Sequence, residues 1–213
     1  MLTLKRQLEL ETIFLLMIGA AISIFFVVYK NNYQPQFSMA SNTPMSSPTP
    51  EATTNPKITF FSQISPDGTK KVIMKKTETQ DNMVTYSFST VNENDSNEKL
   101  IFTEKVDSSS SMDIPFNTWS PDDKYFFIEK NVGGIKSAFA FKATGEQFSG
   151  TEAYLDVTDI FAKQNTGNNF SEATGWASET LIIINTVKAD NTKGLSYWFE
   201  VPGKAIIPLS TEF

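Results

Sequence analysis

The sequence contains no cysteine and no histidine among its 213 residues. Without cysteine there is no disulfide, no zinc–thiolate site and no thiol nucleophile. Without histidine the chain lacks the side chain that ordinarily titrates near neutral pH, which excludes Ser-His-Asp and Cys-His catalysis and imidazole metal sites. The oxygen-rich segment "NENDSNE", 92–98, also lacks the glycine and the spacing of a calcium-binding loop. We expect no metal, no cofactor and no catalytic residue, and a protein that is not an enzyme.

Basic residues are also scarce, with 18 Lys and Arg against 24 Asp and Glu, a formal net charge of -6. An acidic chain without basic clusters is poorly suited to nucleic acid, so no nucleic-acid partner is expected. Hydrophobic residues make up 40% and aromatic residues 13% of the chain. This composition excludes a wholly disordered protein, because it can supply a packed core.

Residues 12–29, "TIFLLMIGAAISIFFVVY", carry no charge. As a helix they would extend about 27 Å, close to the hydrocarbon thickness of a bilayer. A cleaved signal peptide is the alternative, but its apolar region is ordinarily only about 7–15 residues long. Lys5 and Arg6 precede the segment, whereas Lys30 alone follows it closely. The positive-inside rule then predicts a single-pass signal anchor, with residues 1–11 in the cytoplasm and the rest outside the cytoplasm.

Residues 30–56 contain five prolines and many Ser, Thr and Asn, with few charges. Such a segment cannot bury a core, so it predicts a disordered linker between the anchor and a domain over 57–213. From Lys57 onward the composition changes to short apolar runs separated by turn residues, without a sustained helical period. That pattern is typical of β-strands.

One phrase recurs in this domain. "ISPDGTKKVIMK" begins at Ile64, "WSPDDKYFFIEK" at Trp119 and the weaker "WASETLIIINT" at Trp176, at spacings of 55 and 57 residues. Ser-Pro-Asp suits a type I turn, and Gly68, or Asp123 in the second copy, suits the left-handed residue that follows. Further apolar runs follow each turn, so each copy predicts an antiparallel meander of three or four strands over about 57–111, 112–168 and 169–213.

The runs "KVIM", "YFFI" and "LIIIN" that follow the turns are continuous rather than alternating. Continuous runs predict sheets covered on both faces, as in stacked propeller blades. Aromatic-Ser-Pro-Asp-Gly-Lys before an apolar strand resembles the repeat of TolB-like β-propellers. The matching residues are Ser65, Pro66, Asp67, Gly68 and Lys70, then Trp119, Ser120, Pro121, Asp122 and Lys124, with Trp176 in the faded copy. The resemblance implies a structural role for these residues rather than a ligand site.

The predicted fold is therefore all-β, with propeller-like antiparallel meander repeats and one N-terminal transmembrane helix. Propellers ordinarily need four to eight blades, so three units leave several alternatives. The array is open, or is completed by a second copy as a homo-oligomer, or has rearranged into a β-sandwich.

Few side chains in the domain suggest a site. Asp156 and Asp159 are the nearest approach to a catalytic carboxylate pair, although turn and cap roles explain them better.

Within "TDIFAKQ", 158–164, we expect one or two helical turns capped by Thr158 or Asp159. Trp198 is a candidate for a ligand-binding surface, whereas Trp119 and Trp176 are expected to pack in the core. Ser108 to Ser111 predict a flexible connector.

Three functions remain open. The first is a membrane-anchored, extracytoplasmic, propeller-like module that binds a protein or an envelope polymer without catalysis. The second is an envelope hydrolase that uses carboxylates alone. The third is a degenerate repeat domain with a purely structural role.

Overall fold

The computed structural model describes residues 55–92, 94 and 96–211. The predicted anchor at 12–29 and nearly all of the predicted linker lie outside the described residues. Among the residues that are described, no helix has the length and apolar character needed to cross a membrane.

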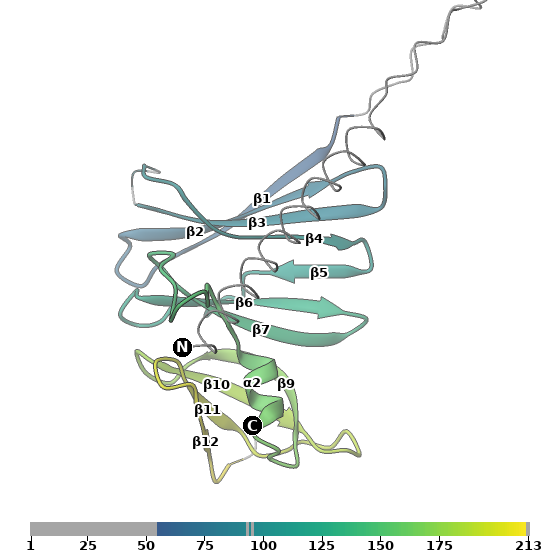
Figure 1. Cartoon of the computed structure of the whole chain (residues 1–213), viewed down its shortest axis with the longest axis vertical. Helices are drawn as coiled ribbons and strands as arrows, with labels where there is room; N and C mark the ends of the chain where they lie inside the picture. The colour runs from purple at the N-terminus through teal and green to yellow at the C-terminus, as the bar shows by residue number, and fades with distance from the viewer. Residues whose placement is uncertain (1–54, 93, 95, 212–213) are drawn as a thin grey trace, which may run out of the picture. The chain divides into compact units, whose positions relative to one another are not determined.

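Twelve strands form three four-stranded antiparallel sheets in this part of the chain (Figure 1). The first sheet contains β1 (Lys57–Ile64), β2 (Lys70–Glu78), β3 (Met83–Asn92) and β4 (Lys99–Asp107). The middle sheet contains β5 (Ser110–Asp113), β6 (Tyr125–Val132), β7 (Ile135–Lys142) and β8 (Leu155–Asp156). The third sheet contains β9 (Asn169–Trp176), β10 (Leu181–Val187), β11 (Tyr197–Glu200) and β12 (Ala205–Pro208).

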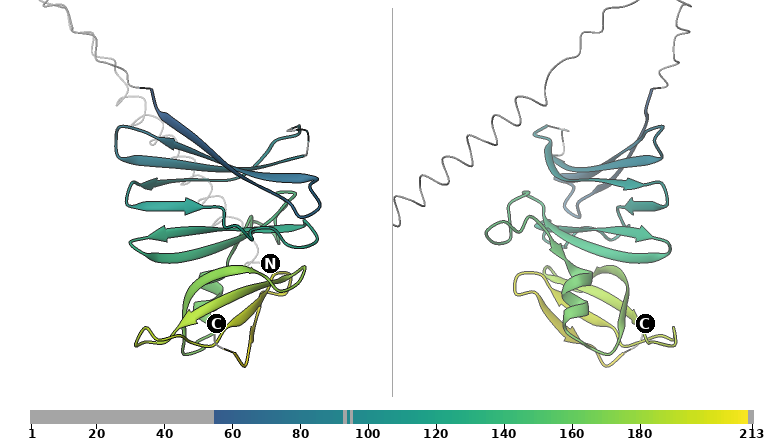
Figure 2. Two further views of the ribbon diagram at one scale, coloured as in Figure 1. Left: turned by 180° about the vertical axis from the view of Figure 1, so that it is seen from behind. Right: turned by 45° about the vertical axis from the view of Figure 1, so that its right-hand side comes forward.

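In every sheet the strands are paired in their order along the chain, so each sheet is a simple meander. The prediction of an all-β fold made of antiparallel meander repeats is confirmed. The sheets follow one another face to face, as the two views in Figure 2 show. One short helix, α2 (Val157–Lys163), connects the middle sheet to the third and packs beside β7 and β9.

Two separate hydrophobic cores fill the spaces between the sheets. Val72, Phe88, Phe126 and Phe141 belong to the core between the first and middle sheets. Phe127, Ala140, Ile182 and Phe199 belong to the core between the middle and third sheets. A β-sandwich would have two sheets around one core, so that alternative is wrong for the described residues.

The middle sheet is covered on both faces. Consecutive residues Phe126, Phe127 and Ile128 are fully buried, because alternate side chains of β6 enter opposite cores. For this sheet the expectation drawn from the continuous apolar run is confirmed. It is wrong for the two outer sheets, where Ile73 and Ile183 are only half-buried while Val72 and Ile182 beside them are fully buried. Each outer sheet therefore has one face that the described residues leave uncovered.

The Ser-Pro-Asp turns have the same geometry in both good copies. Ser65 Oγ donates to Asp67 Oδ1 at 2.8 Å and accepts from the Lys70 amide at 3.0 Å. Ser120 Oγ makes the equivalent bonds to Asp122 Oδ1 at 2.8 Å and from the Tyr125 amide at 3.0 Å. The two serines are buried, so these bonds satisfy hydroxyl groups that water cannot reach.

The residue after each turn aspartate takes the left-handed conformation, with φ of 77° at Gly68 and 58° at Asp123. Glycine adopts this conformation without steric cost, and aspartate tolerates it better than most residues. The turn explains why the serine, aspartate and following residue recur together.

The two tryptophans of the repeat join neighbouring sheets. Trp119 lies in the first core, and its indole N–H donates to the Gln63 carbonyl of the first sheet at 3.1 Å. Trp176 packs against the second core, and its indole N–H donates to the Thr118 carbonyl beside the middle sheet at 3.0 Å. Gln63 and Thr118 occupy the same place in the repeat, two residues before the turn serine. The same hydrogen bond thus sets the position of each sheet against the one before it.

Two local expectations are wrong. The helix α2 begins at Val157 and is capped by Asp156, whose side chain accepts from the Asp159 amide, rather than by Thr158 or Asp159. Residues Ser108 to Ser111 are not a flexible connector, because Asp107 accepts from Ser109 and Ser110 and strand β5 starts at Ser110. Short side-chain bonds to the backbone decided both outcomes, and apolar periodicity does not report them.

Replacing Trp119 with Phe removes the indole donor and leaves the carbonyl of the half-buried Gln63 with one bond fewer. We expect the free energy of unfolding to fall by about 1–3 kcal/mol. Trp176→Phe should cost less, because Trp176 is only half-buried. Urea unfolding of the full chain in detergent, followed by circular dichroism, measures both. Phe116→Leu, at a side chain that is 86% exposed and outside the two cores, is the control, and equal stability of Trp119→Phe and the control would contradict the role of this bond.

Candidate functional site

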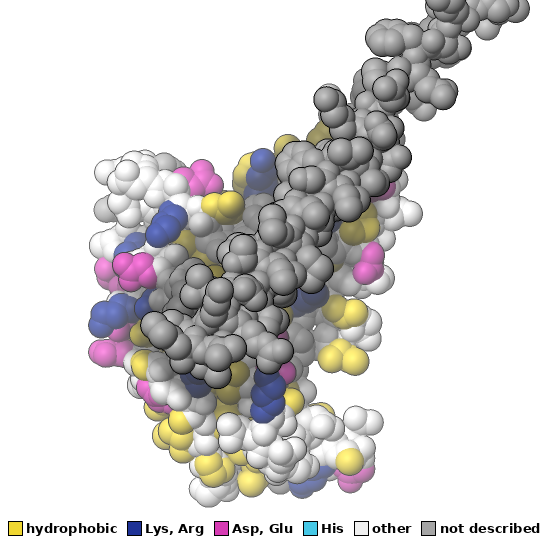
Figure 3. Space-filling view, in the orientation of Figure 1, with side chains coloured by type: hydrophobic (Ala, Val, Ile, Leu, Met, Phe, Trp, Pro, Cys, Tyr) yellow, Lys and Arg dark blue, Asp and Glu magenta, His cyan; other side chains and the backbone are white. Residues whose placement is uncertain are grey.

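The uncovered face of the third sheet holds an apolar groove of about 510 Å³. Ile183 on β10 and Trp198 on β11 are cross-strand neighbours and form its floor. The rest of the lining is Thr174, Asn185, Leu209, Ser210 and Thr211, so the groove carries no charge among its described residues. Hydrophobic side chains gather over this end of the stack in the space-filling view (Figure 3). We call this surface the third-sheet face.

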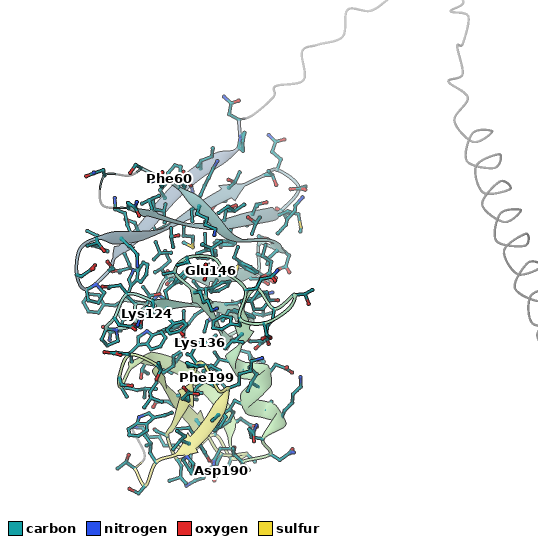
Figure 4. All side chains as sticks on the ribbon, turned by 60° about the vertical axis from the view of Figure 1, so that its left-hand side comes forward. Phe60, Lys124, Lys136, Glu146, Asp190 and Phe199 are labelled. Atoms are coloured by element: carbon teal, nitrogen blue, oxygen red, sulfur yellow. The ribbon has the colours of Figure 1, made fainter. Side chains whose placement is uncertain are left out.

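The uncovered face of the first sheet lies at the opposite end of the stack. Figure 4 shows Phe60 at this end and Asp190, in the β10–β11 loop, at the other. Phe60, Ile64 and Leu100 are 64%, 62% and 62% exposed, which is unusual for large apolar side chains that lie in one sheet. A groove of about 340 Å³ lies beside Phe60 and Leu100, and its lining is Phe60, Ile73, Lys75, Ser87, Ser89, Glu98 and Leu100. We call this surface the first-sheet face.

A third groove, of about 390 Å³, lies beside α2. Its lining combines Phe161 and Phe170 with the amides of Asn165, Asn168 and Asn169. Two of the polar groups in this region are already bonded. Asn168 Nδ2 donates to the Tyr197 hydroxyl at 3.0 Å, and Lys136 Nζ pairs with Glu172 at 3.1 Å and with Glu129 at 3.3 Å. Figure 4 shows Lys136 where the middle and third sheets meet, so this groove is part of their junction.

Each junction between sheets includes a lysine–glutamate pair. Lys130 of β6 pairs with Glu104 of β4 across the first junction at 2.5 Å. Lys136 of β7 pairs with Glu172 of β9 across the second at 3.1 Å. The residue of the first sheet that corresponds to Lys130, at the repeat spacing of 55, is Lys75. Lys75 is exposed on the first-sheet face, where the described residues place no other sheet.

The carboxylates considered from the sequence serve local structure. Asp156 Oδ1 accepts the Asp159 amide at 2.8 Å as the helix cap, and Asp159 pairs with Lys163 one turn later at 2.6 Å. Neither residue lines the three grooves described above. The described residues include no group of three or more His, Cys, Asp or Glu side chains placed to hold a metal ion. Trp198, the third surface candidate, lies in the third-sheet face.

Phe60, Ile64 and Leu100 were not predicted from the sequence to be surface residues. One signal was available in β2, where Lys71, Ile73 and Lys75 alternate with Val72 and Met74. A strand with lysines at every second position has one polar or uncovered face. Reading "KVIM" as a continuous apolar run concealed this alternation.

The two repeat turns meet through a pair of carboxylates. The backbone amide of Thr69, then the Ser65 hydroxyl, lowers the pKa of Asp67 to about 2. Burial, and then the neighbouring Asp67 carboxylate, raises the pKa of Asp123. Asp123 is 6% exposed, and its Oδ1 has no hydrogen-bond partner among the described residues. Lys70 Nζ donates to the Asp123 carbonyl at 3.1 Å and provides a nearby positive charge.

Comparison with known proteins identifies no family for this chain. No protein-family model matches the chain, and no curated protein matches it. Among solved structures, one described as a TolB protein from Agrobacterium tumefaciens aligns with 69% of this chain at 12% identity and a TM-score of 0.33. The aligned part spans 63% of that protein's length. A match at this level carries no information on the fold or function of the present chain.

Asp123→Asn tests the carboxylate pair. Because folding raises the pKa of Asp123, its contribution to stability is fully present below about pH 4 and is lost as pH rises through the folded-state pKa. Asn tolerates the left-handed φ and carries no charge, so the variant should be more stable than the parent at pH 7, with a difference that narrows toward pH 4.5. Asp67 stays ionised in both proteins over this range.

Urea midpoints measured at several pH values between 4.5 and 8 provide the test. Asp190→Asn, in an exposed turn, is the matched control and should not reproduce the neutral-pH gain. A stability difference between Asp123→Asn and the parent that is independent of pH would contradict the assignment.

Proposed function

We propose that this chain is a non-catalytic binding module of the cell envelope, held at a membrane by residues 12–29 and set away from it by the Pro-, Ser- and Thr-rich linker. The N-terminus lies in the cytoplasm and the three-sheet domain outside it. The anchor rests on the length of the uncharged segment and on the lysine and arginine that precede it. The domain acts as a propeller-like array whose outer sheets bind a protein or an envelope polymer.

The observation that carries this proposal is the pair of uncovered faces. A sheet whose two faces are both apolar is stable only when something covers each of them. The middle sheet is covered within the chain, whereas the first-sheet face exposes Phe60, Ile64 and Leu100, and the third-sheet face exposes an apolar groove. These faces can supply binding energy through apolar burial, at about 25 cal/mol per Å² removed from water.

The two competing functions have less support. A hydrolase that relies on carboxylates needs two of them facing across a cleft at about 5–10 Å. Asp156 and Asp159 instead lie on one helix end and are engaged in a cap and an ion pair. A purely structural remnant would have no reason to retain large apolar residues on both outer faces.

A photo-crosslinking residue placed at position 60 or 198 of the full chain in cells tests the proposal. We expect defined covalent adducts from both positions, since each lies on a face that binds a partner. Position 116 is the control, because Phe116 is 86% exposed but lies in the β5–β6 connection and on neither face. Adducts from position 116 alone, or from no position, would contradict the proposed function.

A further inference from the structure

The two uncovered faces are complementary members of one repeated junction. At each junction inside the chain, a sheet presents one face to the sheet that follows it. The following sheet packs its other face against it, and a tryptophan on that face donates a hydrogen bond to a carbonyl of the preceding unit. The first-sheet face corresponds to the face that carries the tryptophan, because Ile64 occupies the place of Trp119 and Trp176. The third-sheet face corresponds to the face that accepts the tryptophan's hydrogen bond, because Gly175 occupies the place of Gln63 and Thr118.

From this we infer that the partner of both faces is a second copy of the chain, with the third sheet of each copy stacked on the first sheet of the other. This inference rests on the proposed binding function and names the partner. Two copies joined in this way have twofold symmetry, cover every sheet on both faces and give a closed set of six. Six lies within the four to eight sheets that close a propeller ring. The contact is head-to-tail, and it ends with two copies because the second contact closes the ring.

The residues on the two faces suit this pairing. Ile73 and Phe60 on the first-sheet face would meet Ile183 and Trp198 on the third-sheet face, as Phe126 and Val72 meet inside the chain. An unrelated protein would have to reproduce both halves of the repeat to fit the two faces equally well.

The junction between copies differs from the internal ones in one respect. Trp119 and Trp176 each donate an indole hydrogen bond at an internal junction. Ile64 has no indole N–H, so the junction between copies lacks that bond. The contact between copies therefore rests on apolar burial and is weaker than the internal junctions. Restoring the donor with Ile64→Trp should tighten the dimer, by about fivefold to tenfold for one hydrogen bond.

Mass measurement of the full chain in mild detergent, by analytical ultracentrifugation, tests the assembly. We expect a dimer, with Ile73→Asp and Ile183→Asp each raising its dissociation constant at least about 100-fold, because each buries an unpaired charge in the junction. Phe116→Asp makes the same chemical change on neither face and should remain dimeric. Circular dichroism establishes that each variant is folded.

The outcomes separate the possible arrangements. Dissociation by only one of the two face variants would indicate pairing of like faces and would overturn the head-to-tail dimer. A monomeric parent protein, or an open polymer, would also overturn it. A weaker dimer in Ile64→Trp would contradict the proposed register.

Cross-linking provides a measurement that does not depend on destabilising variants, and the chain has no native cysteine to interfere. Two differently tagged copies, one with Ser87→Cys and one with Asn185→Cys, are mixed and treated with a short bifunctional maleimide. We expect cross-links between unlike copies and few between like copies, with Phe116→Cys as the unreactive control. The failure of this inference is distinguishable from failure of the proposed function. If the protein is monomeric but positions 60 and 198 capture another molecule in cells, the binding function stands and only the second copy is excluded.

Discussion

The need to cover both faces of a β-sheet is the constraint on which this structure depends. Strand β6 places consecutive residues Phe126, Phe127 and Ile128 in full burial, which is possible only if a sheet lies on each side. The flanking sheets meet that need, and a tryptophan N–H bonded to a carbonyl on the preceding sheet fixes their positions. Each such bond includes one residue that is buried, Trp119 in the first and Thr118 in the second, so displacement of a sheet would leave a buried polar group unsatisfied.

A few residues of the repeat produce this stacking. A buried serine, an aspartate and a left-handed residue close the turn, and an aromatic residue before the serine reaches the neighbouring sheet. The turn also brings Asp123 close to Asp67, and burial together with this neighbouring carboxylate raises the pKa of Asp123. In the third copy the turn residues have changed, yet Trp176 still makes the junction bond, so the inter-sheet contact persists without the motif.

The same constraint underlies the function proposed for the domain. A stack of three sheets necessarily ends in two uncovered faces, unless the ends meet. Large apolar residues are exposed at both ends of the stack. Lys75 is also exposed, whereas its repeat counterpart Lys130 pairs with Glu104 inside a junction. Both features indicate half-junctions that the described residues do not complete. In the proposed function, binding and assembly are properties of these faces.

Sequence alone determined the all-β class, the number of repeats, the turn geometry at Ser65 and Ser120, and the core position of Trp119. These features depend on local chemistry, such as proline, left-handed residues and strand periodicity, which a short stretch of sequence records. Trp176, also expected in the core, is half-buried and packs against the edge of the second core. Only the tertiary structure decided that Asp156 caps α2, and that Phe60 and Trp198 lie on the uncovered faces of the two outer sheets. The reason is physical: an apolar run specifies that a side chain seeks cover, but whether another sheet is present to cover it depends on residues far away in the chain or in another molecule.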